Sequence, residues 1–136
     1  MKAKKILVAG FVAGIVILLI SFIVDAIVQQ VWPVNYMELG GMRAADDPIM
    51  MLFFLNYWVI GFAMAIVYPY FSDKIKGNYI CKGKKFGFLI WLVASLPSVF
   101  IVYTSMNYPI GFTISQFVGS LFYMLCAGIT TAKLMK

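Results

Sequence analysis

The chain has 136 residues, a formal net charge of +6 and a hydrophobic fraction of 63%. Soluble globular proteins are about 45–50% apolar, so a water-soluble fold of this length would leave much apolar surface unburied. The length predicts a single domain. The positive residues form short clusters beside apolar stretches and do not alternate with exposed aromatic residues, which argues against nucleic-acid binding.

Residues that usually carry metal, redox or hydrolytic chemistry are scarce. The chain has no histidine, and its two cysteines, Cys81 and Cys126, form no Cys-x-x-Cys pair, which argues against zinc, haem, iron–sulfur and paired-thiol chemistry. It also lacks a nucleophile–base pair, paired carboxylates at membrane depth and a phosphate-binding glycine loop. We therefore expect no cofactor and no enzymatic activity, while a cation site built from carboxylates alone stays open.

Four long stretches carry almost no charge: of the sixteen formally charged residues, only Asp25 lies within them. Each stretch is long enough to cross the ~30 Å hydrocarbon core of a bilayer, which takes about 20 helical residues. The sequence therefore predicts an all-α integral membrane protein with four transmembrane helices in an antiparallel bundle. The predicted helices cover residues 6–28, 48–72, 86–107 and 110–132.

Local signals predict where these helices begin and end. The first follows three lysines, but its apolar part (6–24) exceeds the about 7–15 residues of a signal-peptide core and no small-x-small cleavage site follows, so we expect a retained helix. Asp47 and Pro48 predict the N-cap and first position of the second helix. Asn107 and Pro109 predict a tight turn that makes the last two helices a hairpin.

Lysines mark three of the five segments outside the helices: the N-terminal segment, the loop of residues 73–85 and the C-terminal segment. The other two loops contain one positive residue, Arg43. Because lysine and arginine accumulate on the cytoplasmic side, we expect a multi-pass protein of the cell membrane with both termini in the cytoplasm. The outer loop (29–47) contains Trp32 and Tyr36, which favour a segment lying in the membrane interface; a plain anchored linker is the alternative.

Polar and small residues in membrane helices face other helices rather than lipid. In each predicted helix several of them share one face at about 100° per residue. The four faces contain Gly10, Gly14, Ser21 and Asp25; Asn56, Ala63 and Tyr70; Gly87, Ala94, Ser98 and Ser105; and Gln116, Ser120, Tyr123, Ala127 and Thr130. We expect helix packing to depend on Gly10, Gly14, Ser21, Gly61, Gly87 and Ser120.

The spacing Gly10-x-x-x-Gly14 allows two helix backbones to approach closely, either within the chain or between chains. A similar pair, Gly83-x-x-x-Gly87, lies at the start of the third helix, and we expect Gly83 to belong to the preceding loop. The two pairs hint at two related hairpins.

Pro97 lies near the middle of the third helix. It removes one backbone hydrogen bond and frees a carbonyl near residue 93, which Ser98 or a neighbouring helix would cover. The resulting kink has two interpretations: it is purely structural, or it shapes a cavity or a hinge.

The most polar residues of the four helices gather toward the outside. Counted from each helix midpoint at about 1.5 Å per residue, Asp25 lies ~12 Å outward, Asn56 and Gln116 ~8 Å, and Ser98 ~4 Å. This depth predicts an outward-facing polar cleft, or a hydrogen-bonded cluster, above a tighter cytoplasmic half. These four residues are the candidates for solute binding or ion coupling.

Asp25 has two interpretations. It is either an interfacial carboxylate that reaches water, or a proton or cation site with Asn56 and Gln116 as neutral partners, in which burial would raise its pKa. Arg43 is the one basic residue that the outer half offers as a partner for it.

We expect a small, oligomeric protein that moves an ion or small solute through the polar cleft. The first alternative is a non-catalytic scaffold or accessory subunit of a larger membrane complex, favoured by the short loops. The second is a lipid-binding protein that uses the lysines between residues 74 and 85. The expected partners are the lipid bilayer and either further copies of the chain or another membrane protein.

Overall fold

The computed structural model describes residues 2–41, 43, 44 and 46–136, and in these residues every regular element is a helix. Four helical segments are long and apolar enough to cross a membrane: Lys2–Val31, Pro48–Ser72, Tyr79–Ser105 and Ile110–Leu134. The elements are α1 (Lys2–Val31), the 3-10 turns η1 (Tyr36–Glu38) and η2 (Pro48–Met51), α2 (Leu52–Ser72), α3 (Tyr79–Ile90), the π-helical turn η3 (Trp91–Ser95), α4 (Leu96–Ser105) and α5 (Ile110–Leu134). We call α3, η3 and α4 together the third span.

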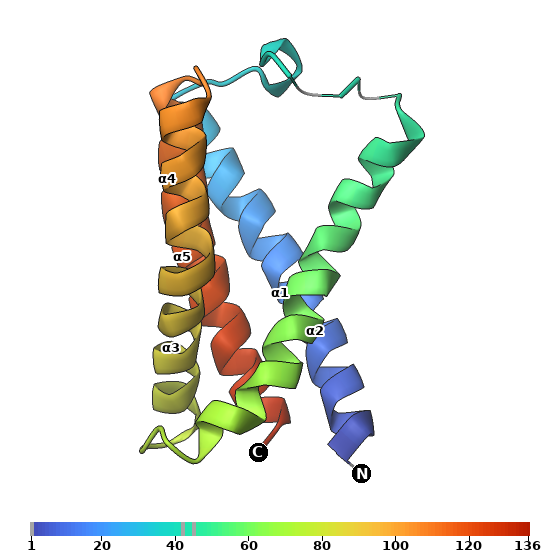
Figure 1. The fold of residues 1–136 in the computed structure, drawn as a ribbon, viewed down its shortest axis with the longest axis vertical. Coiled ribbons are helices and arrows are strands. Elements are labelled where there is room, and N and C mark those ends of the chain that lie inside the picture. The colour runs from blue at the N-terminus through green and yellow to red at the C-terminus, as the bar shows by residue number, and fades with distance from the viewer. Residues whose placement is uncertain (1, 42, 45) are drawn as a thin grey trace.

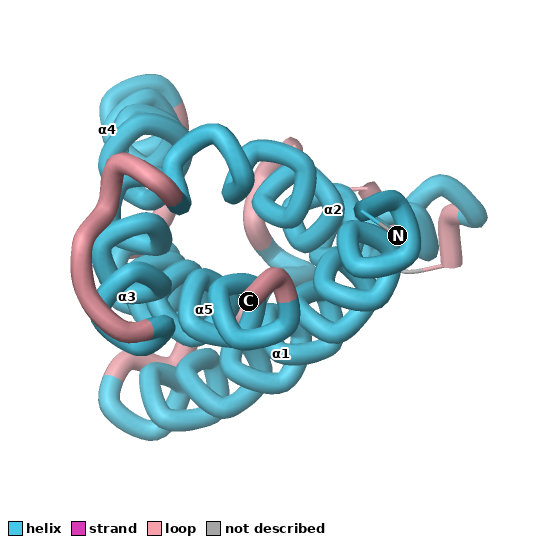
Figure 2. The backbone as a smooth tube through the Cα atoms, turned by 90° about the horizontal axis from the view of Figure 1, so that it is seen from below, coloured by secondary structure: helices cyan, strands magenta, loops and turns pink. Residues whose placement is uncertain are grey.

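The chain runs from one end of the molecule to the other four times, and both termini lie at the same end (Figure 1). We call this the termini end and the opposite one the loop end. Seen from the termini end, α5 lies between the third span and α1, while α2 packs mainly on α1 (Figure 2). Contacts between α2 and the third span are few, so the bundle is open on this side.

The hairpin of α1 and α2 is held by a glycine contact. Gly61 of α2 lies against Gly10 and Gly14 of α1, and all three are buried. A Cβ atom on Gly61 would lie 2.6 Å from the Gly14 nitrogen and 3.1 Å from its Cα, with the Gly10 carbonyl closer still. The two backbones therefore touch without side chains between them, and the Gly10–Gly14 pair serves a contact inside the chain.

The hairpin of the third span and α5 is held in a similar way. Gly128 of α5 lies against Gly83 and Gly87 of α3, where an added Cβ would lie 2.9 Å from the Gly87 nitrogen. The prediction that Gly83 belongs to a loop is therefore wrong. The third span begins at Tyr79 rather than at residue 86, because Asn78 caps the helix and lysines do not interrupt it.

The Asn78 cap is a hydrogen bond of 2.9 Å from the backbone N–H of Cys81 to the side-chain oxygen. The loop between α2 and α3 is shorter than predicted, and three of its five predicted lysines, Lys82, Lys84 and Lys85, stand on the first turns of α3.

The other helix ends differ less from the predicted ones. α1 is longer at both ends than 6–28, and the third span ends at Ser105. The predicted start of the second helix is confirmed: the Asp47 carboxylate accepts a 2.9 Å hydrogen bond from the backbone N–H of Ile49, and Pro48 occupies the first turn. This first turn is 3-10 and continues directly into α2.

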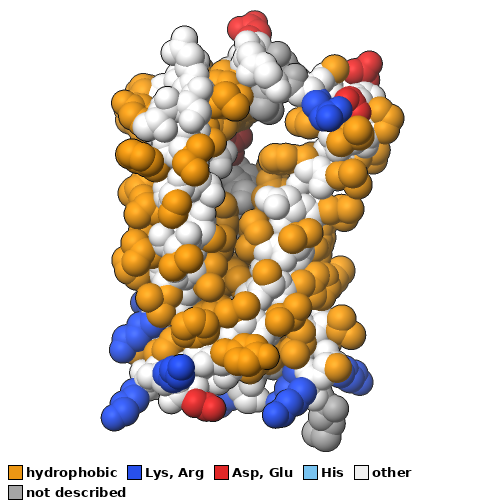
Figure 3. Space-filling view, viewed as in Figure 1, with side chains coloured by type: hydrophobic (Ala, Val, Ile, Leu, Met, Phe, Trp, Pro, Cys, Tyr) orange, Lys and Arg blue, Asp and Glu red, His pale blue; other side chains and the backbone are white. Residues whose placement is uncertain are grey.

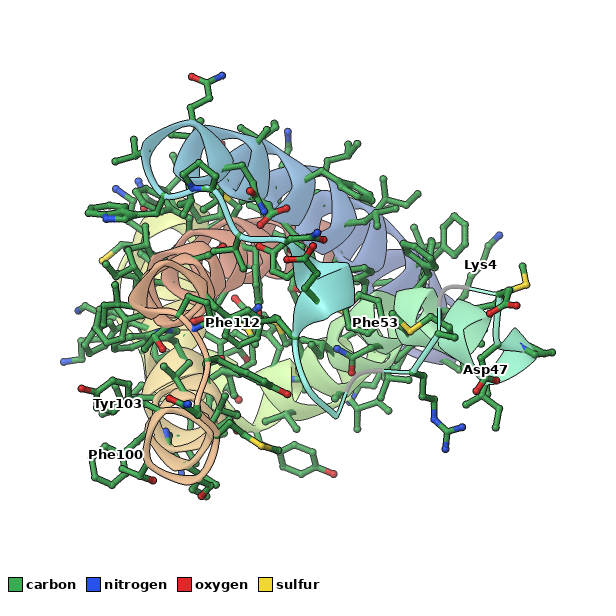
Figure 4. All side chains as sticks on the ribbon, turned by 90° about the horizontal axis from the view of Figure 1, so that it is seen from above. Lys4, Asp47, Phe53, Phe100, Tyr103 and Phe112 are labelled. Carbon is green, nitrogen blue, oxygen red and sulfur yellow. The ribbon has the colours of Figure 1, made fainter. Side chains whose placement is uncertain are left out.

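The outer surface of the spans is apolar. Phe100 and Tyr103, for example, project from α4 away from the other helices (Figure 4). Tyr70 is 74% exposed, so its predicted place on the inner face of the second helix is wrong. The helix turns Gly61 and Tyr68 toward the interior, and Tyr70 follows Tyr68 by about 200° of rotation. Lysines gather at the termini end, as the space-filling view shows (Figure 3).

Candidate binding site

A cavity of about 390 Å³ lies between α2, the third span and α5; we call it the cleft. In the space-filling view a hollow separates α2 from the third span below the outer loop (Figure 3). The volume is at the lower end of the about 300–1,000 Å³ that is typical of small-molecule sites. The cleft is lined by Asn56, Ile60, Ala63, Met64 and Val67 from α2; Ile90, Ala94, Ser95, Ser98 and Val99 from the third span; and Gln116, Ser120, Tyr123 and Met124 from α5.

Three of the four candidate site residues line the cleft, and each comes from a different span. They are Asn56 in α2, Ser98 in α4 and Gln116 in α5. All three are exposed in the isolated chain because the cleft is open. The two primary amides can each donate and accept hydrogen bonds, and the hydroxyl group can do both. The structure thus brings together neutral polar groups that lie far apart in the sequence.

The wall formed by the third span contains a π-helical turn beside Pro97, where the sequence predicted a kink. The backbone N–H of Leu96 donates to the carbonyl of Trp91, five residues earlier, and Pro97 supplies no N–H to the ladder. The Ser98 hydroxyl donates to the carbonyl of Ala94 at 2.7 Å. Single π-turns within α-helices are frequent at functional sites. Here η3 contributes two lining residues, Ala94 and Ser95, so the π-turn forms part of the cleft wall.

A buried hydrogen bond ties this wall to α5. Trp91 is 6% exposed, and its indole Nε1–H donates to the Ser120 hydroxyl at 2.9 Å. The Ser120 hydroxyl in turn donates to the Phe117 carbonyl at 3.1 Å, and the Trp91 ring packs edge-on against the Phe117 ring. The third span and α5 therefore form one connected wall, whereas α2 faces them across the cleft.

Asp25, the fourth candidate, does not line the cleft. Its carboxylate accepts hydrogen bonds from the hydroxyl of Tyr36 and, at 3.3 Å, from the hydroxyl of Ser115. The hydrogen-bond partners of Asp25 are therefore Tyr36 and Ser115, and not the Asn56 and Gln116 of the second interpretation. Gln116 follows Ser115 on α5, and a rotation of about 100° between neighbours turns one side chain toward α1 and the other toward the cleft.

Arg43, the one basic residue that the outer half offers, does not pair with Asp25. Arg43 instead forms an exposed ion pair of 3.0 Å with Asp47, one helical turn away in sequence. The Asp25 carboxylate affects the titration of Tyr36. Burial of the Tyr36 hydroxyl raises its pKa above 10.0, and the hydrogen bond to Asp25 and the negative charge of Asp25 raise it further. Tyr36 therefore stays protonated and remains a donor at neutral pH.

The first part of the outer loop is folded onto the protein. The Gln29 side chain accepts from the Val34 backbone N–H at 2.9 Å and donates to its carbonyl at 2.8 Å, which closes the turn after α1. Farther along, the Tyr108 hydroxyl donates to the Gly40 carbonyl at 3.1 Å. These bonds anchor the first part of the outer loop to α1 and to the start of α5, and neither interpretation of the loop is decided by them.

Sequence reasoning missed Tyr36 and Ser115 as partners of Asp25. Ser115 is next to a candidate residue but on another face, and Tyr36 was assigned to the membrane interface because it is aromatic. Ser21, a predicted packing residue, is half-buried on α1, and its hydroxyl has no hydrogen-bond partner among the described residues. Across the described chain no three His, Cys, Asp or Glu residues gather as metal ligands.

Comparisons of the chain with protein-family models, with curated proteins and with solved structures found no match.

Proposed function

We propose that this chain is a multi-pass membrane protein that binds and moves a small uncharged solute through the cleft. The single observation that supports this function is the convergence of Asn56, Ser98 and Gln116, from three different spans, on one cavity. Small-molecule sites typically combine an apolar lining with a few convergent polar groups, and the cleft has this composition. The proposal includes no catalytic step.

The charges favour an uncharged solute over an ion. None of the described residues that line the cleft is charged. The carboxylate of Asp25 is directed instead to Tyr36 and Ser115, so we assign it to holding the outer loop in place rather than to ion coupling. An ion that left water for this cleft would lose hydration without gaining an opposite charge, which is costly in an apolar medium.

The proposed orientation places both termini in the cytoplasm, with the four spans forming an antiparallel bundle across the bilayer. It is supported by the lysines at the termini end, since positive residues accumulate on the cytoplasmic side. In this orientation the loop end faces outward, and the polar residues of the cleft lie in the outer half of the membrane.

The test is the accessibility of a cysteine placed in the cleft. In intact cells, with Cys81→Ser and Cys126→Ser as background, Ser98→Cys should react with a membrane-impermeant maleimide added outside. The matched control is Val93→Cys, on the same span but 75% exposed on the lipid-facing side. We expect Ser98→Cys to react many times faster. Equal rates at the two positions would refute an outward-facing cleft.

Two further measurements test the solute and the location. Uncharged solutes should protect Ser98→Cys from the reagent, whereas simple salts should not. Ala63→Phe places a large side chain in the cleft and should slow the labelling. Val59→Phe is the control: Val59 is 62% exposed on the outer face of α2, and its replacement should leave the labelling rate unchanged. Protection by salts alone would overturn the uncharged solute. A cleft that labels slowly and resists every solute would favour an accessory subunit whose partner helix fills this side.

A further inference from the structure

We infer that the cleft takes an uncharged single-chain amphiphile, which enters sideways from the bilayer between α2 and the third span. The inference rests on the proposed function and names the class of solute and its route. It depends on three features: the lateral opening, the outer loop above it, and the order of polar and apolar residues along the three walls.

The lateral opening lies between α2 and the third span. α2 packs mainly on α1 and contacts the third span sparsely, and the hollow between them reaches the surface (Figure 3). The opening is bounded by α2 and the third span, whose outer surfaces are apolar. Because both belong to membrane-spanning segments, the medium at this opening is lipid rather than water.

The outer loop crosses the loop end above the cleft without filling it (Figure 3). It leaves α1, is held over the start of α5, and then crosses the loop end to reach α2 (Figures 1 and 4). The bond from Tyr36 to Asp25 and the bond from Tyr108 to Gly40 hold its first part down. At its far end Asp47 caps the turn that begins the second span. The loop therefore passes above the cleft, while its side is left open.

The α2 wall changes from polar to apolar along the cleft. Its polar residue, Asn56, lies near the loop end, whereas Val67 lies about 16 Å closer to the termini end at about 1.5 Å per residue. On α5 the amide of Gln116 lies at the outer end and Met124 about 12 Å beneath it, with the hydroxyl residues Ser120 and Tyr123 between them.

On the third span the order runs from Ser98 near the loop end to Ile90. Taken together, the walls have both amides at the outer end and mainly apolar residues beneath, with Ser95, Ser120 and Tyr123 as the hydroxyl residues at depth. A molecule with a polar head and an apolar chain satisfies both parts of the cleft at once, because its chain avoids the amides and its head is not left unpaired.

The head group must be uncharged. The described lining residues offer amides and hydroxyls, which bind hydroxyl, ester or amide groups, and no ammonium, guanidinium or carboxylate. The basic residue of the outer loop, Arg43, is paired with Asp47. An anionic fatty acid or phospholipid head would therefore lack the basic partner that anionic heads usually bind.

The experiment uses the cysteine-free background with Ser98→Cys in phosphatidylcholine vesicles and the impermeant maleimide outside. The probes are 1-monooleoylglycerol, oleate at alkaline pH and glycerol. Monooleoylglycerol should slow the labelling of Ser98→Cys several-fold and leave that of Ser105→Cys, exposed at the end of α4, unchanged. Oleate and glycerol should have little effect, and Gln116→Leu should remove the protection.

The possible outcomes separate the two proposals. Protection by glycerol but not by monooleoylglycerol would overturn the amphiphile and leave the proposed function standing. Equal protection by oleate would overturn the uncharged head group. Rapid labelling that neither uncharged probe slows would overturn the amphiphile, whereas equal labelling of Ser98→Cys and Val93→Cys would reject the proposed function and the inference with it.

A second measurement does not depend on cysteine chemistry. With Trp32→Phe and Trp58→Phe, the fluorescence of Trp91 reports on the cleft wall. A brominated monoacylglycerol should quench it saturably, and Ala63→Phe should reduce the quenching while Val59→Phe should not. Brominated phosphatidylcholine that quenches equally well would show contact with bulk lipid and overturn the inference.

Discussion

Replacing Gly61 by alanine adds one methyl group at the point where α1 and α2 touch. The new Cβ would lie 2.6 Å from the Gly14 nitrogen and 3.1 Å from the Gly14 Cα, both backbone atoms. Backbone cannot rotate out of the way, so the two helices must separate. Overpacking of this kind costs about 1–3 kcal/mol, while alanine in place of glycine inside a helix gains about 0.5–1 kcal/mol.

Gly119→Ala is the matched control. Its new Cβ would meet only the Val24 side chain, at 3.4 Å from Cγ1 and 3.9 Å from Cβ, which is ordinary van der Waals contact. Both substitutions gain the same helix propensity, so their difference isolates the steric cost. We expect Gly61→Ala to be less stable than Gly119→Ala by about 1–3 kcal/mol, which is roughly 5- to 150-fold in the unfolding equilibrium.

The assay is reversible unfolding in mixed micelles titrated with sodium dodecyl sulfate, followed by circular dichroism. Gly119→Ala should match or exceed the wild type, and Gly61→Ala should unfold at a lower detergent fraction. Equal unfolding curves for the two variants would refute the close backbone contact between α1 and α2.

Two predictions concern the outer loop. Tyr36→Phe removes a hydrogen-bond donor from the Asp25 carboxylate and should lower the free energy of unfolding by about 1.5 kcal/mol. This value is the lower end for a hydrogen bond to a charged group, because Tyr36 is only half-buried. The control is Tyr103→Phe, at an exposed position of α4, and equal losses of stability in the two variants would contradict the hydrogen bond. Because the pKa of Tyr36 is raised above 10.0, the protonated donor stabilises the fold below that pH, and this contribution disappears as the pH rises through the raised pKa. Melting curves of wild type and Tyr36→Phe should therefore converge above about pH 10, whereas a constant gap from pH 8 to 11 would contradict the assignment.

The four spans and the polar wall residues were predictable from the sequence, because apolar length and helical periodicity are local properties. Asn56, Ser98 and Gln116 were predicted from their depth and do line one cleft. The start of the third span was not predictable in this way, because hydropathy indicates where a helix becomes apolar and not where its backbone hydrogen bonds begin. Lys82 and its neighbours are polar but helical.

The partners of Asp25 were beyond sequence reasoning for a different reason. They depend on how the outer loop folds back, which places Tyr36 beside Asp25. They also depend on the rotation of α5, which turns Ser115 rather than Gln116 toward α1. A rotation of about 100° per residue gives the angle between Ser115 and Gln116, but it does not tell which of the two side chains faces α1 and which faces the cleft.

The contact at Gly61 has a mechanical consequence. At Gly61 the backbones of α1 and α2 touch directly, with Trp58 and Phe62 of α2 packed against Gly14 and Gly10 beside this point, so the contact acts as a pivot for α2. Its outer arm, from Gly61 to Leu52, is about 14 Å long at about 1.5 Å per residue, so a tilt of about 10° carries its tip roughly 2 Å. Asn56 lies on this arm, whereas Trp91 is anchored to α5 on the opposite wall. The width of the cleft is therefore governed chiefly by the angle of one helix.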